Sequence, residues 1–377
     1  MLLKRFHDRA AAWQQAGLQR QLHPVAQDQN VFCSNNYLGL AHHPRLKQAM
    51  ITATDSCGVG TGASHLVVGY TEQHQQAEQA FAQAFAFEAA MLFSCGYMAN
   101  VGVQQALLTR NDVVYHDRLN HASLLDGARL SDAKLQRFHH LDYDHLESLL
   151  QRDAGQAQLV VTDSVFSMQG DQADLKRLVQ LRQQYGFTLI VDDAHGIGVV
   201  GDKGQGSLQQ AGLSVDDVDL LICPLGKALG CFGAVVLGKQ ATIDALRQFA
   251  RSYIYTTAMP AALAAVAQES LAVMQQESWR HARLQTLIAY FKQAAAQRGI
   301  QLLPSDTAIQ ALVTGSVDSC CHLSDALAKA GFKVTAIRQP TVPAGSEQLR
   351  FTLNVGQSEE DIDRLMQVIE QEVCHVC

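Results

Sequence analysis

The chain has 377 residues, of which 47% are hydrophobic and 17% are charged, and its formal net charge at pH 7 is −7. This length allows two or three domains, and the composition is sufficient to bury a large core. The acidic balance and the lack of any lysine- or arginine-rich run in the sequence argue against a nucleic-acid partner. No apolar run reaches the ~18 residues of a membrane-spanning helix, so we expect no membrane partner.

The nine cysteines show no framework spacing, which is typical of a protein in a reducing compartment. Residues 1–5 lead into a polar segment without an apolar signal core, so we expect a cytoplasmic protein. Cys374 and Cys377 form a terminal CxxC motif. A metal site needs more ligands and a fixed scaffold, so a frayed tail is the preferred interpretation and a redox or metal role the alternative.

The first part of the chain predicts helices, a short strand and a glycine-rich loop. Residues 1–29 indicate a helix and a connector that carries Arg20, which by itself is a surface charge. Residues 32–40 indicate a short strand that breaks into a turn. The loop 58–64 has neither a Walker motif nor GxGxxG spacing, so it is a flexible loop or a backbone that approaches a ligand. Residues 71–87 have the apolar spacing of an amphipathic helix.

Two further strands precede candidate binding residues. Residues 89–93 indicate a strand, and Gly96 and Tyr97 then open a helix, where free N–H groups and the helix dipole favour a phosphate. An ordinary strand-to-helix turn is an equal alternative on these residues alone. Residues 112–115 indicate the next strand, and His121 follows it. An imidazole at such a place stacks on a flat cofactor or caps a helix.

Two apolar runs organise the rest of the chain. Residues 188–191 and 220–223 have no polar alternation, which is typical of strands buried in a parallel sheet. The first run leads to Asp192 and His195, and the second leads to Lys227, which stands between two glycines. Ligands of open α/β sheets bind beyond the carboxyl ends of the strands, so these three side chains are expected at one crevice.

An amine, a carboxylate and an imidazole suit pyridoxal phosphate. That cofactor needs a lysine for a Schiff base and a carboxylate that keeps its ring nitrogen protonated. The alternative is that Lys227 is a solvated surface residue and that Asp192 caps a helix. The flanking glycines and the preceding buried strand favour the cofactor.

Other polar residues follow predicted elements at the same edge or beyond it. Residues 159–162 indicate a strand that delivers Ser167, and residues 174–185 indicate a helix that ends at Gly186. Thr257 is either a phosphate donor or a cap of the alanine-rich helix that follows.

The pattern changes after about Glu277. Short alternating strands at 308–313, 334–337 and 349–353 occur between helices, which indicates a smaller α+β domain. Arg338 lies at a strand end beside a proline-rich segment. Arginine binds carboxylates in bidentate fashion, and a surface salt bridge is the alternative.

These elements predict an α/β protein with a mostly parallel central sheet. Residues 1–39 are expected to form an N-terminal helix and connector that pack with the small domain. Residues 40–276 are expected to form the large cofactor-binding domain, and residues 277–377 the small α+β domain.

Several motifs together resemble the α-oxoamine synthase family of pyridoxal-phosphate enzymes. They are Ser34–Leu40, Gly60–Ser64, Asn120–Leu124, Val165–Met168, Asp192–Gly196, Gly226–Gly230 and Ala336–Pro343. The resemblance runs from about Arg20 to about Ile369, and the segments before Pro24 and around Arg338 are closest to the branch that makes 8-amino-7-oxononanoate. It implies the aminotransferase-like architecture called fold type I and a homodimer with active sites at the subunit interface.

The resemblance also implies roles for the cofactor residues. Lys227 would hold pyridoxal phosphate as a Schiff base, Asp192 would pair with the pyridine nitrogen and His195 with the ring hydroxyl. His121 would stack on the ring and help with chemistry at the substrate Cα. The remaining implied cofactor contacts are Gly96 and Tyr97 at the phosphate through backbone donors, Ser167, and Thr257 from the other subunit.

Arg20, Arg338, Thr341 and His121 would contact the substrate, with Arg338 on a carboxylate. The implied reaction is a decarboxylative condensation of L-alanine with a pimeloyl thioester of coenzyme A or of acyl carrier protein, in biotin synthesis. Freed Lys227 would remove the Cα proton. The alternatives are a sister activity such as glycine C-acetyltransferase or a serine-using acyltransferase, a plain aminotransferase, and a binding protein that has lost its cofactor.

Two positions depart from the family pattern. Pro224 stands where the family usually has a threonine that binds phosphate, and Asp163 stands where glutamate is frequent. Proline has neither a hydroxyl nor an N–H, so we expect weaker cofactor retention.

Overall fold

The computed structural model describes residues 1–16, 18–19, 22, 24 and 30–374. Arg20, His375 and Cys377 therefore lie outside the described residues. The chain divides into two compact units. Unit 1 comprises Met1–Ser34, Met168–Gly170 and Thr286–Cys377, and unit 2 comprises Asn35–Ser167 and Asp171–Gln285. The predicted packing of residues 1–39 with the small domain stays a prediction.

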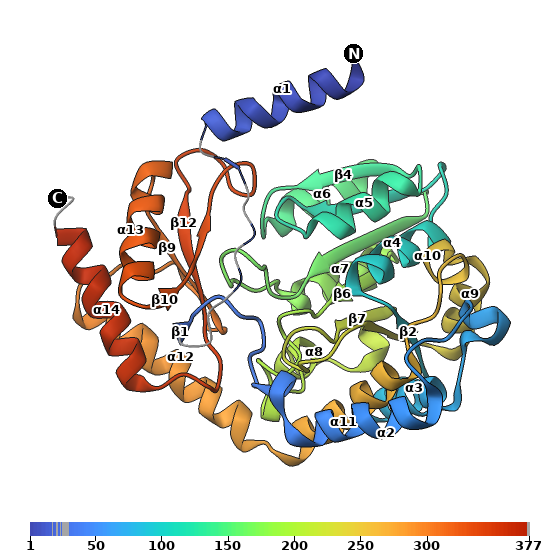
Figure 1. The fold of residues 1–377 in the computed structure, drawn as a ribbon. Helices are drawn as coiled ribbons and strands as arrows, with labels where there is room; N and C mark the ends of the chain where they lie inside the picture. Colours follow the sequence, from blue (N-terminus) through green and yellow to red (C-terminus); the bar gives the residue numbers. More distant parts are fainter. Residues whose placement is uncertain (17, 20–21, 23, 25–29, 375–377) are drawn as a thin grey trace. The chain divides into compact units, whose positions relative to one another are not determined.

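Unit 2 is built on a seven-stranded sheet with the strand order β2-β8-β7-β6-β5-β3-β4 (Figure 1). Five neighbouring strands, from β4 to β7, run parallel, and β8 is antiparallel to both of its neighbours. The predicted mostly parallel sheet is therefore confirmed. The strands are β2 (Ala89–Phe93), β3 (Val113–Asp117), β4 (Lys134–Phe138), β5 (Gln158–Asp163), β6 (Thr188–Asp192), β7 (Leu220–Pro224) and β8 (Ala234–Gly238).

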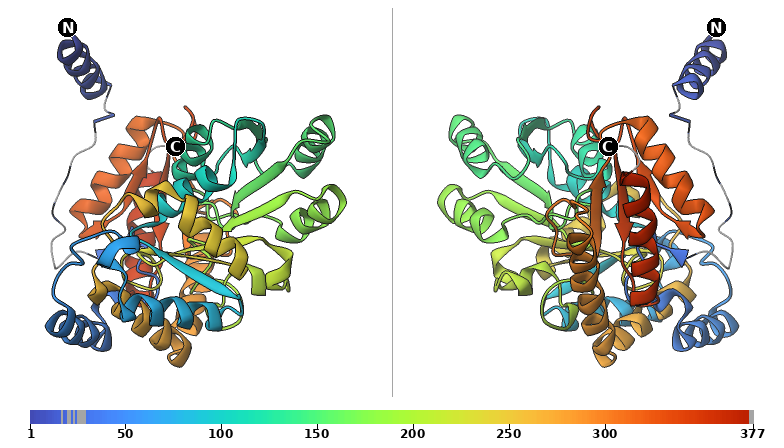
Figure 2. Two further views of the ribbon diagram at one scale, coloured as in Figure 1. Left: turned by 90° about the vertical axis from the view of Figure 1, so that its right-hand side faces the viewer. Right: turned by 90° about the vertical axis from the view of Figure 1, so that its left-hand side faces the viewer.

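Helices pack against this sheet and against one another (Figures 1 and 2). The helix α4 packs on β7 and β8, and α3 packs on β2 and β8. Apolar side chains of β2, β3, β5 and α4 form one buried cluster. The helices of unit 2 are α2 (Pro44–Cys57), α3 (Glu72–Ala84), α4 (Gly96–Leu107), α5 (Ala122–Leu130), α6 (Tyr143–Arg152), α7 (Leu175–Tyr185), α8 (Ser207–Gln210), α9 (Gln240–Phe249), α10 (Arg251–Ile254) and α11 (Ala261–Gln276).

Local chemistry explains where these helices begin and end. The Asp174 carboxylate accepts from the N–H of Arg177 and caps α7, and Gly186 closes the helix in the left-handed conformation, as its sequence predicts. The helix α3 ends at Ala84, three residues before the predicted end, because Ala86 turns the chain with a φ of 59°. The long helix α12 (Trp279–Gln297) follows α11.

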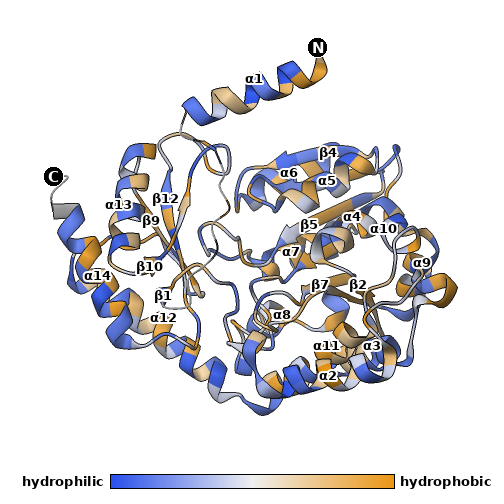
Figure 3. Ribbon diagram, in the orientation of Figure 1, coloured by the Kyte–Doolittle hydropathy of each residue, from blue (hydrophilic) through white to orange (hydrophobic). Residues whose placement is uncertain are grey.

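Unit 1 has an antiparallel sheet with the order β11-β12-β9, made of β9 (Ile309–Val313), β11 (Thr335–Ile337) and β12 (Gln348–Thr352). The strand β1 (Asn30–Val31) pairs in parallel with β10 (Phe332–Lys333), so the first strand lies just before its predicted range. Two helices, α13 (Val317–Lys329) and α14 (Glu359–Cys374), complete this α+β arrangement. The helix α1 (Leu2–Gln15) alternates hydrophobic and hydrophilic residues (Figure 3) and buries none of them.

Among the described residues, no helix has the length and apolar character needed to cross a membrane. The same residues contain no group of three or more side chains that could hold a metal ion.

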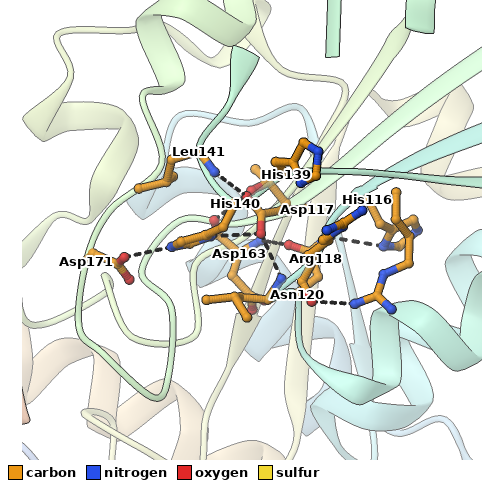
Figure 4. Close-up of polar contacts among 12 residues, drawn as sticks. His116, Asp117, Arg118, Asn120, His139, His140, Leu141, Asp163 and Asp171 are labelled. Atoms are coloured by element: carbon orange, nitrogen blue, oxygen red, sulfur yellow. Dashed lines mark hydrogen bonds and ion pairs between the residues drawn. The ribbon is translucent and has the colours of Figure 1, made fainter. Parts of the chain in front are cut away.

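A charged network joins the carboxyl ends of β3 and β4 to the loop before α7 (Figure 4). His140 lies 2.8 Å from Asp117 through Nδ1 and 2.7 Å from Asp171 through Nε2. Burial by itself would lower the pKa of His140, but hydrogen bonds to the two carboxylates outweigh it and raise the pKa from 6.5 to about 9. Asp117 also accepts from the backbone N–H of Leu119 and Leu141. The network thus fixes the backbone next to the candidate site.

We expect His140→Gln to lower the free energy of unfolding by about 1–3 kcal/mol at pH 6. The folded-state pKa exceeds the unfolded one, so the contribution of His140 is fully present below pH 6.5 and is lost as the pH rises through about 9. Urea unfolding of the native protein and of His140→Gln at pH 6, 8 and 10 measures this contribution. The difference between their free energies of unfolding should become smaller as the pH rises. A gap that stays constant would contradict a charged His140.

Candidate active site

Lys227 lies in the tight turn after β7, next to His195. Its Nζ is 2.9 Å from Nε2 of His195, and the Tyr37 hydroxyl is 2.6 Å from Nδ1 of the same ring. Gly230 allows this turn, because it has a φ of 59° and a Cβ there would lie 2.3 Å from the backbone nitrogen of Ala41. The predicted amine and imidazole therefore meet at the carboxyl end of the sheet.

Asp192 ends β6 and is 3% exposed. Its carboxylate accepts from Asn100 Nδ2 at 2.7 Å and from the Ala194 N–H at 3.1 Å. The register of β5 and β6 places Asp163 directly opposite Asp192. Burial, and then the charge of Asp192, raise the pKa of Asp163 well above its usual value. The raised pKa favours the neutral form of Asp163 beside Asp192.

His121 is the N-cap of α5. Its backbone N–H donates to Asp163 Oδ2 at 2.7 Å (Asp163 is labelled in Figure 4), and its Nδ1 lies 2.7 Å from Ser123 Oγ. The residue is exposed to solvent, but the protein atoms around its ring lower its pKa; the charge of Asp192 opposes this shift, and the charge of Lys227 adds to it. The net downward shift favours the neutral form of the His121 ring.

The N-terminus of α4 lies beside the end of β7. Gly96 begins this helix, and no side chain caps it. The N–H groups of Gly96 and Tyr97 belong to the first turn and have no acceptor within the helix. A Cβ at Gly96 would lie 2.9 Å from Cγ of Pro224, so glycine is required where the two segments meet. The side chain of Tyr97 is exposed, and its hydroxyl donates to Asp126, so the backbone of this turn is what remains for an anion.

The other predicted residues are placed as follows. Ser167 is half-buried after β5, and Thr257 is exposed. Arg338 and Thr341 belong to unit 1, where they share one turn, because the N–H of Thr341 donates to the carbonyl of Arg338 at 3.0 Å. Arg338 also donates to the Cys321 sulfur at 3.2 Å. Arg20 lies outside the described residues.

Four residues were not predicted as part of the site: Tyr37, Asn100, Ser123 and Asn35. Tyr37 contacts His195, and its hydroxyl donates to Asn35 at 3.2 Å. Asn100 contacts both Asp192 and Ser123. A polar residue one helical turn after Gly96, within the largely apolar first half of α4, was the available signal for Asn100, since a buried amide needs a partner.

These groups fit pyridoxal phosphate. The lysine offers an amine, Asp192 offers a buried acceptor for a protonated ring nitrogen, and the α4 turn offers N–H donors that no side chain covers. Among the described residues, the buried Oδ1 of Asn100 also has no hydrogen-bond partner. Such an unpaired polar atom is uncommon in a protein interior and is typical of a binding site.

Comparisons with known proteins identify the family. The sequence profile of the family Aminotransferase class I and II matches residues 27–369. The chain belongs to this family. It is 48% identical over 341 residues to the 8-amino-7-oxononanoate synthase of Alkalilimnicola ehrlichii, which covers 90% of this chain and 87% of that protein. It is 43% identical over 369 residues to the 8-amino-7-oxononanoate synthase of Saccharophagus degradans, and the match covers 98% of this chain and 93% of that protein.

Solved structures agree with this assignment. The 8-amino-7-oxononanoate synthase of Francisella tularensis superposes with a TM-score of 0.82 at 30% identity, covering 93% of this chain and 99% of that one. A serine palmitoyltransferase from S. paucimobilis, with bound PLP–myriocin aldimine, superposes with a TM-score of 0.93 at 26% identity and covers 100% and 99%. The chain is thus an enzyme of the 8-amino-7-oxononanoate synthase group, and the predicted resemblance and fold class are confirmed.

Asp163→Asn should stabilise the protein at neutral pH by about 1–3 kcal/mol. The folded-state pKa of Asp163 is raised, so the native state loses stability relative to the unfolded state as the pH rises above 3.8. Asparagine mimics the neutral carboxyl and still accepts from the His121 N–H. Denaturant unfolding at pH 4 and pH 8 measures the difference, which should vanish at the lower pH.

Asp163→Ala is the matched control. It removes the acceptor as well as the charge, so it should destabilise the protein at both pH values. An asparagine variant less stable than native at pH 8 would mean that Asp163 is ionised in the folded protein.

Proposed function

We propose that the protein condenses L-alanine with a pimeloyl thioester to give 8-amino-7-oxononanoate, carbon dioxide and a free thiol. The observation that carries the proposal is the meeting of Lys227, His195 and Asp192 at one end of the parallel sheet, in a chain whose relatives are named for this product. The thioester carrier is coenzyme A or acyl carrier protein.

Each of the site residues has a separate proposed role. Lys227 would hold pyridoxal phosphate as a Schiff base, and the bound cofactor would supply an electron sink for chemistry at the substrate Cα. Asp192 would keep the ring nitrogen protonated, and His195 would contact the ring hydroxyl. The amine of Lys227, once free, would remove the Cα proton, and His121 would cover the ring. This assignment is supported by the 2.9 Å Lys227–His195 distance and by the burial of Asp192.

The remaining roles are part of the same proposal. The Gly96 and Tyr97 N–H groups would bind the phosphate of the cofactor, and Ser167 would contact the cofactor. Arg338 and Thr341 bind substrate, with the guanidinium on a carboxylate. Arg20 has the same proposed role.

The proposal includes a homodimer in the cytoplasm. The segment Leu66–Val68 exposes three consecutive apolar side chains at 52%, 72% and 71%, and such patches mark contact surfaces. The N–H of Ala258 donates to the carbonyl of Ala63 at 2.9 Å, and Thr61 donates to the carbonyl of Ala258 at 2.8 Å. A partner that covers this patch would therefore lie near Thr257, which supports a contact of Thr257 with the partner's cofactor. The seven cysteines from Cys33 to Cys321 are all unpaired, as in a reducing compartment.

The assay is thiol release from pimeloyl-CoA with added pyridoxal phosphate, with product identified by mass spectrometry. L-Alanine should support turnover, and glycine and L-serine should not. Lys227→Ala should reduce the rate by about 10⁴-fold or more, because the variant loses both the cofactor linkage and the base. The unfolding temperature of this variant should equal that of the native protein. Turnover by this variant would refute the role of Lys227, and glycine-dependent release from acetyl-CoA would indicate a sister activity.

Pro224→Thr should tighten cofactor binding by about ten-fold to a hundred-fold. The new hydroxyl can donate to the phosphate, and a hydrogen bond to a charged group contributes about 1.5–3 kcal/mol. Titration of cofactor-free protein with pyridoxal phosphate measures the affinity. Pro224→Val has nearly the shape of threonine without its hydroxyl, so it should bind like the native protein. Equal affinity of all three would mean that other donors already bind the phosphate.

A further inference from the structure

Two buried residues connect the acid and the imidazole of the site. Asn100 is 2% exposed and Ser123 is fully buried. Asn100 Nδ2 donates to Asp192 Oδ2 at 2.7 Å and to Ser123 Oγ at 2.9 Å. Ser123 Oγ in turn lies 2.7 Å from His121 Nδ1. A continuous chain of hydrogen bonds therefore runs from the carboxylate to the ring.

The carboxylate sets the direction of this chain. The Asp192 oxygens act as acceptors here, so the NH₂ group of Asn100 must face them. The opposite orientation of the amide would bring two oxygens together. The second N–H of Asn100 then points at Ser123 Oγ, which leaves the hydroxyl proton of Ser123 free to donate onward.

Two donors meet at His121 Nδ1. One is the Ser123 hydroxyl, and the other is the Ser123 backbone N–H at 3.2 Å. A proton on Nδ1 would face that N–H and would leave the hydroxyl proton of Ser123 without an acceptor. The unprotonated nitrogen of the neutral ring is therefore Nδ1, and the proton is on Nε2.

We propose that Asn100 and Ser123 are positioning residues that hold His121 in its Nε2–H tautomer and link the ring orientation to Asp192. The charged groups around the ring are Asp192, Lys227 and Asp126. Burial lowers the pKa of His121, which agrees with a neutral ring. This chain of hydrogen bonds, from Asp192 through Asn100 and Ser123 to His121, is a property of the folded protein alone. Only its catalytic consequence depends on the proposed function.

The catalytic consequence is that His121 and Lys227 have different roles. His121 offers one uncharged N–H donor at Nε2 and has no free lone pair, because its Nδ1 is already an acceptor for two donors. It can hold a substrate oxygen but cannot take the Cα proton. The base must then be Lys227, whose amine lies 2.9 Å from Nε2 of His195.

Nitrogen-15 NMR of histidine-labelled, cofactor-free protein tests the tautomer directly. The chain has 15 histidines, and the His121 signals are assigned by their loss in His121→Gln. We expect a protonated Nε2 and an unprotonated Nδ1 in the native protein. Ser123→Ala should shift the tautomer ratio toward Nδ1–H by about three- to ten-fold, because one donor is lost. Ser123→Thr keeps the hydroxyl and should restore the native spectrum.

Two further variants distinguish loss of this chain of hydrogen bonds from general destabilisation of the protein. Asn100→Ala frees the Ser123 hydroxyl to rotate and should shift the ratio in the same direction. Ser131→Ala removes a buried serine hydroxyl at the other end of α5, where it donates to the Ala128 carbonyl, and should leave the His121 signals unchanged. A native proton on Nδ1 would overturn the proposal. So would native signals in folded Asn100→Ala, even if Ser123→Ala failed to fold.

Discussion

The carboxylate of Asp192, buried at the end of a parallel strand, is the constraint on which the site depends. A charge with 3% exposure is costly unless donors surround it, and here the donors are Asn100 and the backbone of Ala194. Asp163 is directly opposite in the sheet. Two ionised carboxylates on neighbouring strands would repel each other, and the raised pKa of Asp163 favours its uncharged form. The remaining negative charge is what a protonated pyridine ring requires.

The other groups of the site follow from sheet topology. Parallel strands place their carboxyl ends on one edge, so residues separated by many positions in sequence reach one place. Lys227 follows β7, His195 follows β6, and His121 follows β3. The N-terminus of α4 opens beside Pro224 and supplies N–H groups without a side-chain cap. The site is therefore a property of the sheet edge rather than of one segment.

The loops around the site are held by polar contacts beneath it. His140 joins Asp117 to Asp171, and Asn120 donates to the carbonyl of Val161 at 2.7 Å (Figure 4). These contacts lie close to the backbone that carries His121. A loop positioned on a rigid scaffold in this way can keep a catalytic side chain in one orientation.

The sequence by itself determined the central strands β6 and β7, because their apolar runs have no polar alternation, and it placed Asp192 at the end of one and Lys227 just after the other. It also determined the family, because several motifs occurred together. Only the tertiary structure decided that Asn100 and Tyr37 belong to the site. Their partners, Asp192 and His195, are distant in sequence, and no local pattern records which helix face meets which strand end. The raised pKa of Asp163 likewise required the structure, since it depends on burial and on a carboxylate of the neighbouring strand.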